Sequence, residues 1–202
     1  MLASLSYIIP TQKTGNHSAA TANKTMECRP AASVLFNKAK HRLLNINGWG
    51  ELCCGSGAKF QLTDKNGIEL NIAEPETGHL IRIKAPTPNT GALEYDWLRI
   101  EKFESYKDPL KDEELFGFIV RPIPEPFNRT GNEQVYLNDT TSTFLILRKS
   151  LTVYVMEHGR NEEPKAAGSF FNKIKHFAAS LASTLGLTKT QWTNLVKGIL
   201  NH

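Results

Sequence analysis

Apolar and polar residues alternate along residues 60–72 in the pattern of a β-hairpin. Asn66-Gly67 lies at the centre of this segment, and a glycine there can take the positive φ that a tight hairpin turn requires. The alternation therefore predicts an antiparallel sheet with one face on a core. The apolar positions that define this face are Phe60, Leu62, Ile68, Leu70 and Ile72.

The same alternation predicts the register of the hairpin. A two-residue loop would bring apolar side chains opposite polar ones. A loop of residues 65–67 instead places Leu62 opposite Leu70 and, one pair further out, Phe60 opposite Ile72. Because a slip of one residue would turn every apolar side chain to the other face, we expect the longer loop.

Five further segments are rich in β-branched and aromatic residues, and most are separated by stretches rich in proline, glycine, asparagine and aspartate. No helical pattern interrupts them, so parallel βαβ units are not expected. Together with the hairpin they predict an α+β protein with an antiparallel sheet or barrel of about seven strands. The segments are Leu80–Lys84, Tyr95–Phe103, Leu115–Arg121, Thr143–Arg148 and Leu151–His158.

One of these segments is apolar on both faces. Residues 144–147 read Phe-Leu-Ile-Leu, without the polar alternation that a half-exposed strand shows. We expect this strand to be covered by a helix on one side and by the barrel interior on the other.

Helical spacing occurs before and after the strands. Residues 30–47 predict one helix, with Pro30 suited to its first turn. Residues 170–185 predict a second helix, and Thr188 to Gln191 form a capping box for a third. The apolar face of this last helix is Trp192, Leu195, Val196, Ile199 and Leu200.

The N-terminal region shows no periodicity. Residues 11–29 are polar and rich in Thr, Asn, Ala and Lys, which predicts a flexible lead-in. We therefore divide the chain into a lead-in over 1–29, a helix with an antiparallel sheet or barrel over 30–165, and a C-terminal helix pair over 166–202. The helix pair is expected to pack on the sheet within the same domain.

Composition narrows the possible functions. Hydrophobic residues make up 40% of the 202 residues, enough for a packed core, and the net charge of +4 is too small and too evenly spread to predict nucleic-acid binding. Three cysteines without a C-x-x-C motif predict a reducing compartment and no metal site. No segment is long and apolar enough to span a membrane. We expect a soluble, cytoplasmic protein without a cofactor.

The densest polar cluster, residues 157–163, follows a predicted strand. Its His158 has the chemistry of a general acid or base that Glu162 orients, while Arg160 is suited to an anion and Asn161 lies between them. The alternative is a charged strand end and loop that Arg160 ties down. We take all four residues as candidate ligand-binding residues.

Three further candidates lie on neighbouring predicted strands. Thr141 and Thr143 belong to a hydroxyl-rich run whose side chains either line a pocket or satisfy a turn's own backbone. Arg121 ends an apolar strand and directly precedes Pro122, so it either meets an anionic ligand or guards a strand edge.

The chain carries no Walker loop, no G-x-S-x-G and no H-E-x-x-H motif. Its order of a helix, six or seven antiparallel strands and a helix resembles helix-grip barrels, which cradle apolar ligands, in outline over residues 31–202. A calycin-like or other small barrel fits nearly as well. Likeness at the level of the fold does not assign a function.

Three hypotheses follow. The first is a non-enzymatic domain that binds a small apolar or carboxylate-bearing ligand in a barrel cavity. The second is an interaction module that docks on a partner, or on a second copy, through its C-terminal helices. The third is an enzyme built around His158, Arg160 and Glu162. Burial of the helix faces would disfavour the second, and a shared cavity would favour the third.

Overall fold

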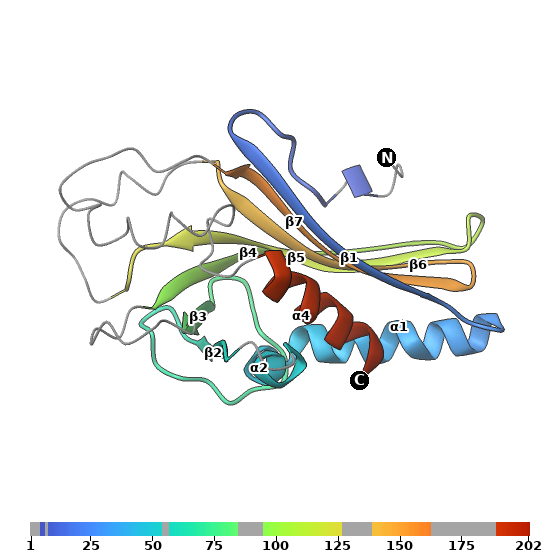
Figure 1. The fold of residues 1–202 in the computed structure, drawn as a ribbon, viewed down its shortest axis with the longest axis horizontal. Coiled ribbons are helices and arrows are strands. Elements are labelled where there is room, and N and C mark those ends of the chain that lie inside the picture. The colour runs from blue at the N-terminus through green and yellow to red at the C-terminus, as the bar shows by residue number, and fades with distance from the viewer. Residues whose placement is uncertain (1–4, 7, 54–56, 85–94, 127–138, 163–188) are drawn as a thin grey trace.

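The computed structural model describes residues 5–6, 8–53, 57–84, 95–126, 139–162 and 189–202. Over these residues the chain forms an α+β fold of a seven-stranded antiparallel sheet and three α-helices (Figure 1). The strands are β1 (Asn16–Thr25), β2 (Lys59–Thr63), β3 (Leu80–Lys84), β4 (Asp96–Asp108), β5 (Glu113–Ile123), β6 (Thr141–Lys149) and β7 (Thr152–Glu162). The α-helices are α1 (Arg29–Leu44), α2 (Trp49–Leu52) and α4 (Lys189–Asn201), and a 3-10 turn, η2 (Ile46–Gly48), joins the first two.

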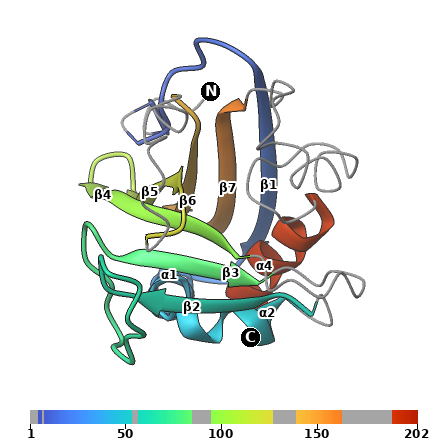
Figure 2. The same cartoon turned by 90° about the vertical axis from the view of Figure 1, so that its left-hand side faces the viewer.

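The sheet is open. Its strand order is β1-β7-β6-β5-β4-β3-β2, and β1 and β2 stand at its two ends. Figure 2 shows it bending strongly, so that β2 and β3 run across the direction of β1 and β7. The antiparallel sheet was predicted correctly, and its alternative, a closed barrel, was wrong. The five strand segments predicted after the hairpin correspond to β3 through β7.

The first strand occupies part of the predicted lead-in. Residues 16–25 form β1, which pairs with β7 from Thr25 opposite Thr152 to Asn16 opposite Glu162. Only Ala20 of this strand is buried, so its sequence lacks the apolar alternation that identifies a strand. Backbone hydrogen bonds to β7 hold this strand in the sheet, so the prediction of a flexible lead-in was wrong for residues 16–25.

The hairpin at residues 60–72 has the predicted register over a short length. Thr63 bridges Glu69, the Leu70 N–H donates to the Leu62 carbonyl at 2.9 Å, and Gly67 has a φ of 79°. The outer pair, predicted to bring Ile72 opposite Phe60, does not form, and Ile72 is 42% exposed.

A side chain inserted into the hairpin explains where the pairing stops. The Asn47 side chain accepts from the Leu62 N–H at 2.7 Å and donates to the Leu70 carbonyl at 2.8 Å. It occupies the two backbone groups that would otherwise bond to each other across the strands. The second arm of the hairpin diverges from this point and forms no strand of the sheet. In the sheet, β2 pairs with β3.

The core lies between the sheet and the helices. The predicted first helix is α1, and the face predicted for it is buried: Ala32, Leu35, Phe36, Ala39 and Leu43. At the centre of the core Trp49 is fully buried, with its ring 5.0 Å from that of Phe144 and 5.5 Å from that of Phe60. Phe144 also lies 5.3 Å from the ring of Trp192 on α4. Aromatic rings thus cluster at the centre of the core.

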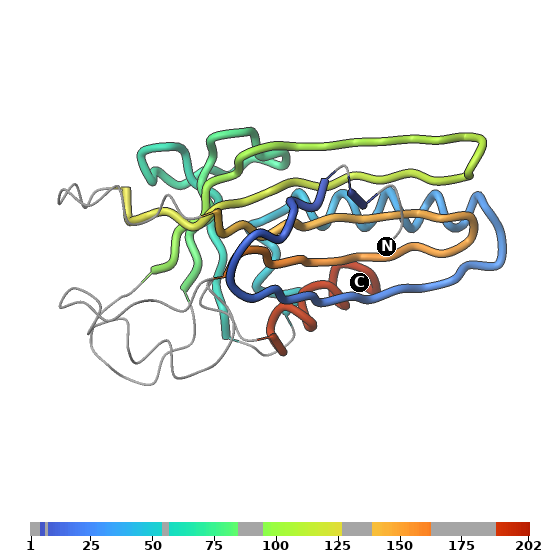
Figure 3. Tube along the Cα trace, turned by 90° about the horizontal axis from the view of Figure 1, so that it is seen from above, coloured from blue at the N-terminus to red at the C-terminus, as the bar shows by residue number. Residues whose placement is uncertain are grey.

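The other side of the central strand is covered differently from the prediction. Phe144 and Ile146 of β6 face the main core, whereas Leu145 and Leu147 face a second apolar cluster. The cover there is the N-terminal segment, through Leu5, Ile8 and Ile9, and not a barrel interior. Figure 1 shows this segment on the side of the sheet opposite α1, and Figure 3 looks onto that side.

The last predicted helix is α4, and its apolar face is buried as expected. The helix predicted over 170–185 and the cap at Thr188 lie outside the described residues. Within α4, Gly198 packs against the end of α2, where a Cβ would lie 2.2 Å from the Leu52 carbonyl oxygen. Glycine is disfavoured inside a helix, so this close approach accounts for its presence.

Gly198→Ala is therefore expected to lower stability although alanine is the better helix former. The gain in helix propensity is about 1 kcal/mol, while overpacking against a backbone carbonyl costs about 1–3 kcal/mol or more. Urea unfolding measures the balance. Lys197→Ala, at the exposed neighbouring position, serves as the control and is expected to stay within about 0.5 kcal/mol. A Gly198→Ala protein more stable than the wild type would show that α4 does not lie against α2.

Candidate functional site

The alternation of β7 divides the candidate residues between the two faces of the sheet. Val153 and Val155 belong to the main core on the inner face, and Met156 belongs to the cluster under the N-terminal segment on the outer face. Because neighbouring side chains of a strand point to opposite faces, Glu157 lies on the inner face and His158 on the outer face. The two faces are best considered separately.

Two carboxylates lie on the inner face at the end of β7. Glu157 is 2% exposed and its Oε1 accepts from the Ser142 hydroxyl at 2.5 Å, whereas Glu162 accepts from the Ser18 hydroxyl at 2.7 Å. Burial raises the pKa of Glu157 to about 7, and burial also raises the pKa of Glu162. Both groups therefore retain protons at a higher pH than exposed glutamates do.

Gly159 makes room for this arrangement. A Cβ at this position would lie 2.0 Å from Glu162 Oε1 and 2.4 Å from the Ser18 hydroxyl. The glycine thus allows the carboxylate from the strand end to fold back over β7 and reach β1.

On the outer face, His158 is opposite Thr143 of β6. Its Nε2 is buried and has no hydrogen-bond partner among the described residues. Burial, together with the charge of Arg160, lowers the pKa of His158 to about 4, so the ring is neutral near pH 7. Glu162 does not orient it, because that carboxylate lies on the other face and accepts from Ser18.

Arg160 shares the outer face with His158. Its side chain is 7% exposed, and its Nη1 donates to the Gly159 carbonyl at 2.9 Å. Because the acceptor is the preceding residue of the same strand, Arg160 is not fastened to another element by this bond. Its charge still acts on the neighbouring titratable groups.

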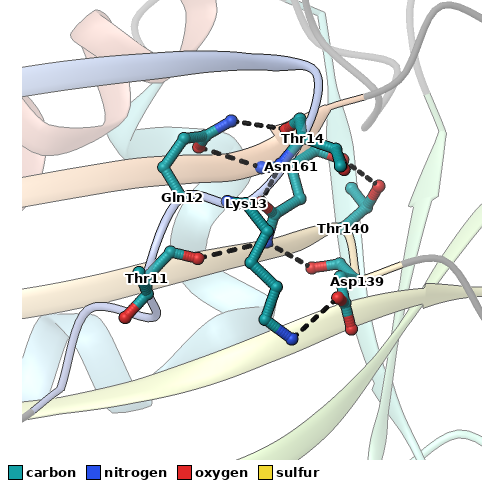
Figure 4. Close-up of polar contacts among 7 residues, drawn as sticks. All are labelled: Thr11, Gln12, Lys13, Thr14, Asp139, Thr140 and Asn161. Atoms are coloured by element: carbon teal, nitrogen blue, oxygen red, sulfur yellow. Dashed lines mark hydrogen bonds and ion pairs between the residues drawn. The ribbon is translucent and has the colours of Figure 1, made fainter.

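Asn161 connects β7 to the N-terminal segment (Figure 4). Its Oδ1 accepts from the backbone N–H groups of Lys13 at 2.7 Å and Thr14 at 3.2 Å, and its own N–H donates to Gln12 Oε1 at 3.1 Å. Its Nδ2 donates to the Asp139 carbonyl at 3.1 Å. Asn161 has a φ of 54°, which asparagine tolerates better than most residues, and this conformation lies at the irregular end of the β1–β7 pairing.

A pocket of about 410 Å³ opens beside Asn161 on the outer face. One wall comes from the N-terminal segment, and the others come from β4, β5, β6, β7 and Asp139, which lies two residues before β6. Its size lies within the range of small-molecule sites. The lining residues are Pro10, Thr11, Lys13, Glu101, Lys102, Ile119, Arg121, Asp139, Thr141 and Asn161.

Both signs of charge occur in the pocket, and cations outnumber carboxylates by one. Lys13 forms an ion pair with Asp139 at 2.9 Å, and Arg121 lies 3.6 Å from Glu101. Glu101 also accepts from Arg99 at 2.8 Å, so one carboxylate is shared by two arginines.

Two buried threonine hydroxyls on this face have no hydrogen-bond partner in the described part of the chain. Thr141, which is 4% exposed and lines the pocket, has an unpartnered Oγ1, and so does the fully buried Thr143 two positions along β6. Buried hydroxyls are nearly always satisfied by protein or by a bound molecule, so these atoms need an explanation.

The structure thus brings most of the predicted site residues together. Arg121, Thr141 and Asn161 line one pocket, and Thr143, His158 and Arg160 lie on the same face of the adjoining strands. Glu162 is separated from them by the sheet. Sequence reasoning missed the residues that the N-terminal segment and β4 contribute, of which Lys13, Glu101 and Lys102 are charged. The apolar pair Ile8-Ile9 before Pro10 was the available signal that this segment packs on the protein.

No group of three or more His, Cys, Asp or Glu side chains suited to a metal ion occurs in the described ranges. Within the same ranges, none of the helices has both the length and the apolar character needed to cross a membrane.

Comparison with known proteins places the chain in no family: no family model matches it, and no curated protein does. Among solved structures, it is similar to Ara h 8.0201, with 8% identity, a TM-score of 0.36, and coverage of 93% of this chain and 100% of that chain. It is also similar to a truncated norcoclaurine synthase from Thalictrum flavum, with 10% identity, a TM-score of 0.39, and coverage of 96% and 99%.

Proposed function

We propose that this protein binds a small molecule bearing a carboxylate or a similar anionic group in the outer-face pocket. The buried, unpartnered hydroxyl of Thr141 in the pocket wall carries the proposal. A hydroxyl left without a partner costs about 1–3 kcal/mol, and a rotation of the Thr141 side chain toward the pocket would let an anionic oxygen remove that cost.

The charges around Thr141 support an anion over a cation. Lys13, Lys102 and Arg121 supply three positively charged groups from three different elements. Arg121 is half-buried, so water screens its charge less than it screens that of an exposed lysine. Ile119 and Pro10 offer apolar contact to the rest of a ligand.

The two other hypotheses are less well supported. The apolar face of α4 is buried within the core, with Leu195 and Ile199 fully so, which disfavours docking through that face. An enzyme built on His158 and Glu162 would need the two side chains together, and they lie on opposite faces of the sheet.

The test measures the rise in melting temperature that acetate, succinate, benzoate and inorganic phosphate each produce. At least one of them is expected to stabilise the wild type by mass action. Thr141→Val keeps the side-chain shape and removes the hydroxyl, and we expect it to weaken binding by about tenfold, the equivalent of one hydrogen bond to a charged group. Arg121→Gln is expected to weaken binding at least as much.

Thr143→Val is the matched control, because it removes a similarly buried and unpartnered hydroxyl that does not line the pocket. Its affinity for the probe is expected to equal that of the wild type. If no probe stabilises the wild type, or if Thr141→Val and Thr143→Val bind equally well, water satisfies these hydroxyls and the pocket is not an anion site.

A further inference from the structure

The N-terminal segment is held on the outer face without being a strand of the sheet. We use the name strap for its residues 8–14, which cross over β6 and β7 and then turn into β1. The turn is made at Gly15, whose φ of 66° few other residues adopt readily. The strap can therefore leave the sheet without breaking a strand pairing.

Two separate sets of contacts hold the strap. At one end, Ile8 and Ile9 pack on an apolar cluster that includes Leu145 and Met156. At the other end the polar contacts converge on Asn161, which binds the backbone of Lys13 and Thr14 and the side chain of Gln12. One residue of β7, through its side chain and its backbone N–H, is thus the latch for the polar half of the strap (Figure 4).

The same residues build the pocket. Pro10, Thr11 and Lys13 of the strap form one wall, and the latch residue Asn161 forms part of the next. With the strap undocked, a ligand would lose that wall and the Lys13 charge. A ligand that contacts both walls binds the docked state better than the undocked state.

We propose that the strap is a removable wall of the ligand site, so that strap docking, latched by Asn161, and ligand binding stabilise each other. This inference rests on the proposed function of the pocket. By reciprocity, whatever the ligand gains from a docked strap, the strap gains from a bound ligand. A modification, a partner or a substitution that releases the latch would then lower ligand affinity although the walls that β4, β5 and β6 supply are unchanged.

Amide hydrogen exchange of Lys13 and Thr14 reports the docking directly, because both N–H groups donate to Asn161. In the wild type, the probe that binds best among the three carboxylates and phosphate is added at ten times its dissociation constant. If only the docked state binds, exchange at these two amides slows by about tenfold.

Asn161→Gly removes the latch while permitting the positive φ of this residue. It is expected to speed exchange at Lys13 and Thr14 by tenfold or more and to weaken the probe. Thr25→Ala is the control: it removes a side-chain hydrogen bond of 2.9 Å to Thr152 at the far end of the same strand pair. It is expected to change neither the exchange at Lys13 and Thr14 nor the affinity.

The outcomes separate the inference from the function. If a probe binds the wild type but leaves exchange at Lys13 and Thr14 unchanged, the pocket is a site and the strap is not coupled to it. Equal affinity of the wild type and the Asn161→Gly protein, with the strap loosened in the latter, also overturns the coupling. If no probe binds the wild type, the proposed function fails, and the coupling fails with it.

Discussion

Replacing Trp49 with alanine is expected to lower the free energy of unfolding by about 3–5 kcal/mol, the usual cost of truncating a fully buried tryptophan. The ring is 0% exposed and lies within 6.3 Å of the rings of Phe60, Phe118 and Phe144. Its Nε1 donates to the Leu43 carbonyl at 3.1 Å and so joins the end of α1 to the core. Denaturant unfolding followed by circular dichroism measures the loss.

Two controls locate the cause. Trp49→Phe keeps an aromatic ring but leaves the Leu43 carbonyl without its donor, so we expect a smaller loss than for alanine. Val34→Ala shortens a side chain that is 54% exposed on the neighbouring helix, and it is expected to stay within about 0.5 kcal/mol. A Trp49→Ala protein as stable as the Val34→Ala protein would mean that the aromatic cluster is not the centre of the core.

The parts of the fold that follow from periodicity were predictable from the sequence. The β3 segment was predicted residue for residue, and β5, β6 and β7 to within a few residues, because each buries apolar side chains in a regular pattern. The burial of residues 144–147 on both faces of the sheet could also be predicted, but the segment that covers their outer face could not. That cover comes from residues more than a hundred positions away in the chain, and no local pattern records such a contact.

The first strand could not be found in this way. Its side chains are mostly exposed, and its place in the sheet depends on pairing with β7. Strand propensity reflects the fit of side chains to a half-buried surface, and β1 offers little of that surface. The same applies to the second arm of the hairpin, where the Asn47 side chain takes the backbone groups that continued pairing would use.

The candidate site was predictable in its residues but not in its arrangement. The cluster at the end of β7 and the threonines of β6 were recognised as polar groups at strand ends, and the structure places them in neighbouring strands. The pairing of His158 with Glu162 failed because the strand is irregular at Asn161, whose φ is 54°. In a regular strand Glu162 would share the outer face with His158. The irregularity turns Glu162 to the inner face, opposite Asn16 of β1, and no hydrophobic pattern in the sequence predicts it.

The second large effect is expected in the pH dependence of stability, at Glu157. Its pKa is about 7 in the folded protein, against 4.5 for a free glutamate. Between these values the unfolded chain releases a proton that the folded protein keeps, so stability falls as the pH rises. The slope is about 1.4 kcal/mol per pH unit, and the loss between pH 4.5 and 7 amounts to roughly 3 kcal/mol.

His158 acts in the opposite direction. Its pKa is about 4 in the folded protein and 6.5 in a free histidine, so the unfolded chain binds the extra proton between these values. Stability then rises with pH from about 4 to 6.5. Between pH 4.5 and 6.5 the two contributions to the pH dependence of stability have opposite signs and largely cancel. Neither contribution is therefore visible in the wild type. Only variants that remove one group at a time reveal them.

Glu157→Gln should therefore become progressively more stable relative to the wild type as the pH rises from 4.5 to 7, by roughly 3 kcal/mol in total. The glutamine carbonyl can still accept from the Ser142 hydroxyl, so the change removes the titration and keeps the contact.

His158→Gln is the paired variant, and its stability relative to the wild type should fall as the pH rises from 4 to 6.5. Urea unfolding of the three proteins across this range gives the two differences, in which the contributions of other groups largely cancel. A difference between Glu157→Gln and wild type that is the same at pH 4.5 and 7 would show that the Glu157 carboxyl is ionised, and therefore solvated or paired, in the folded protein.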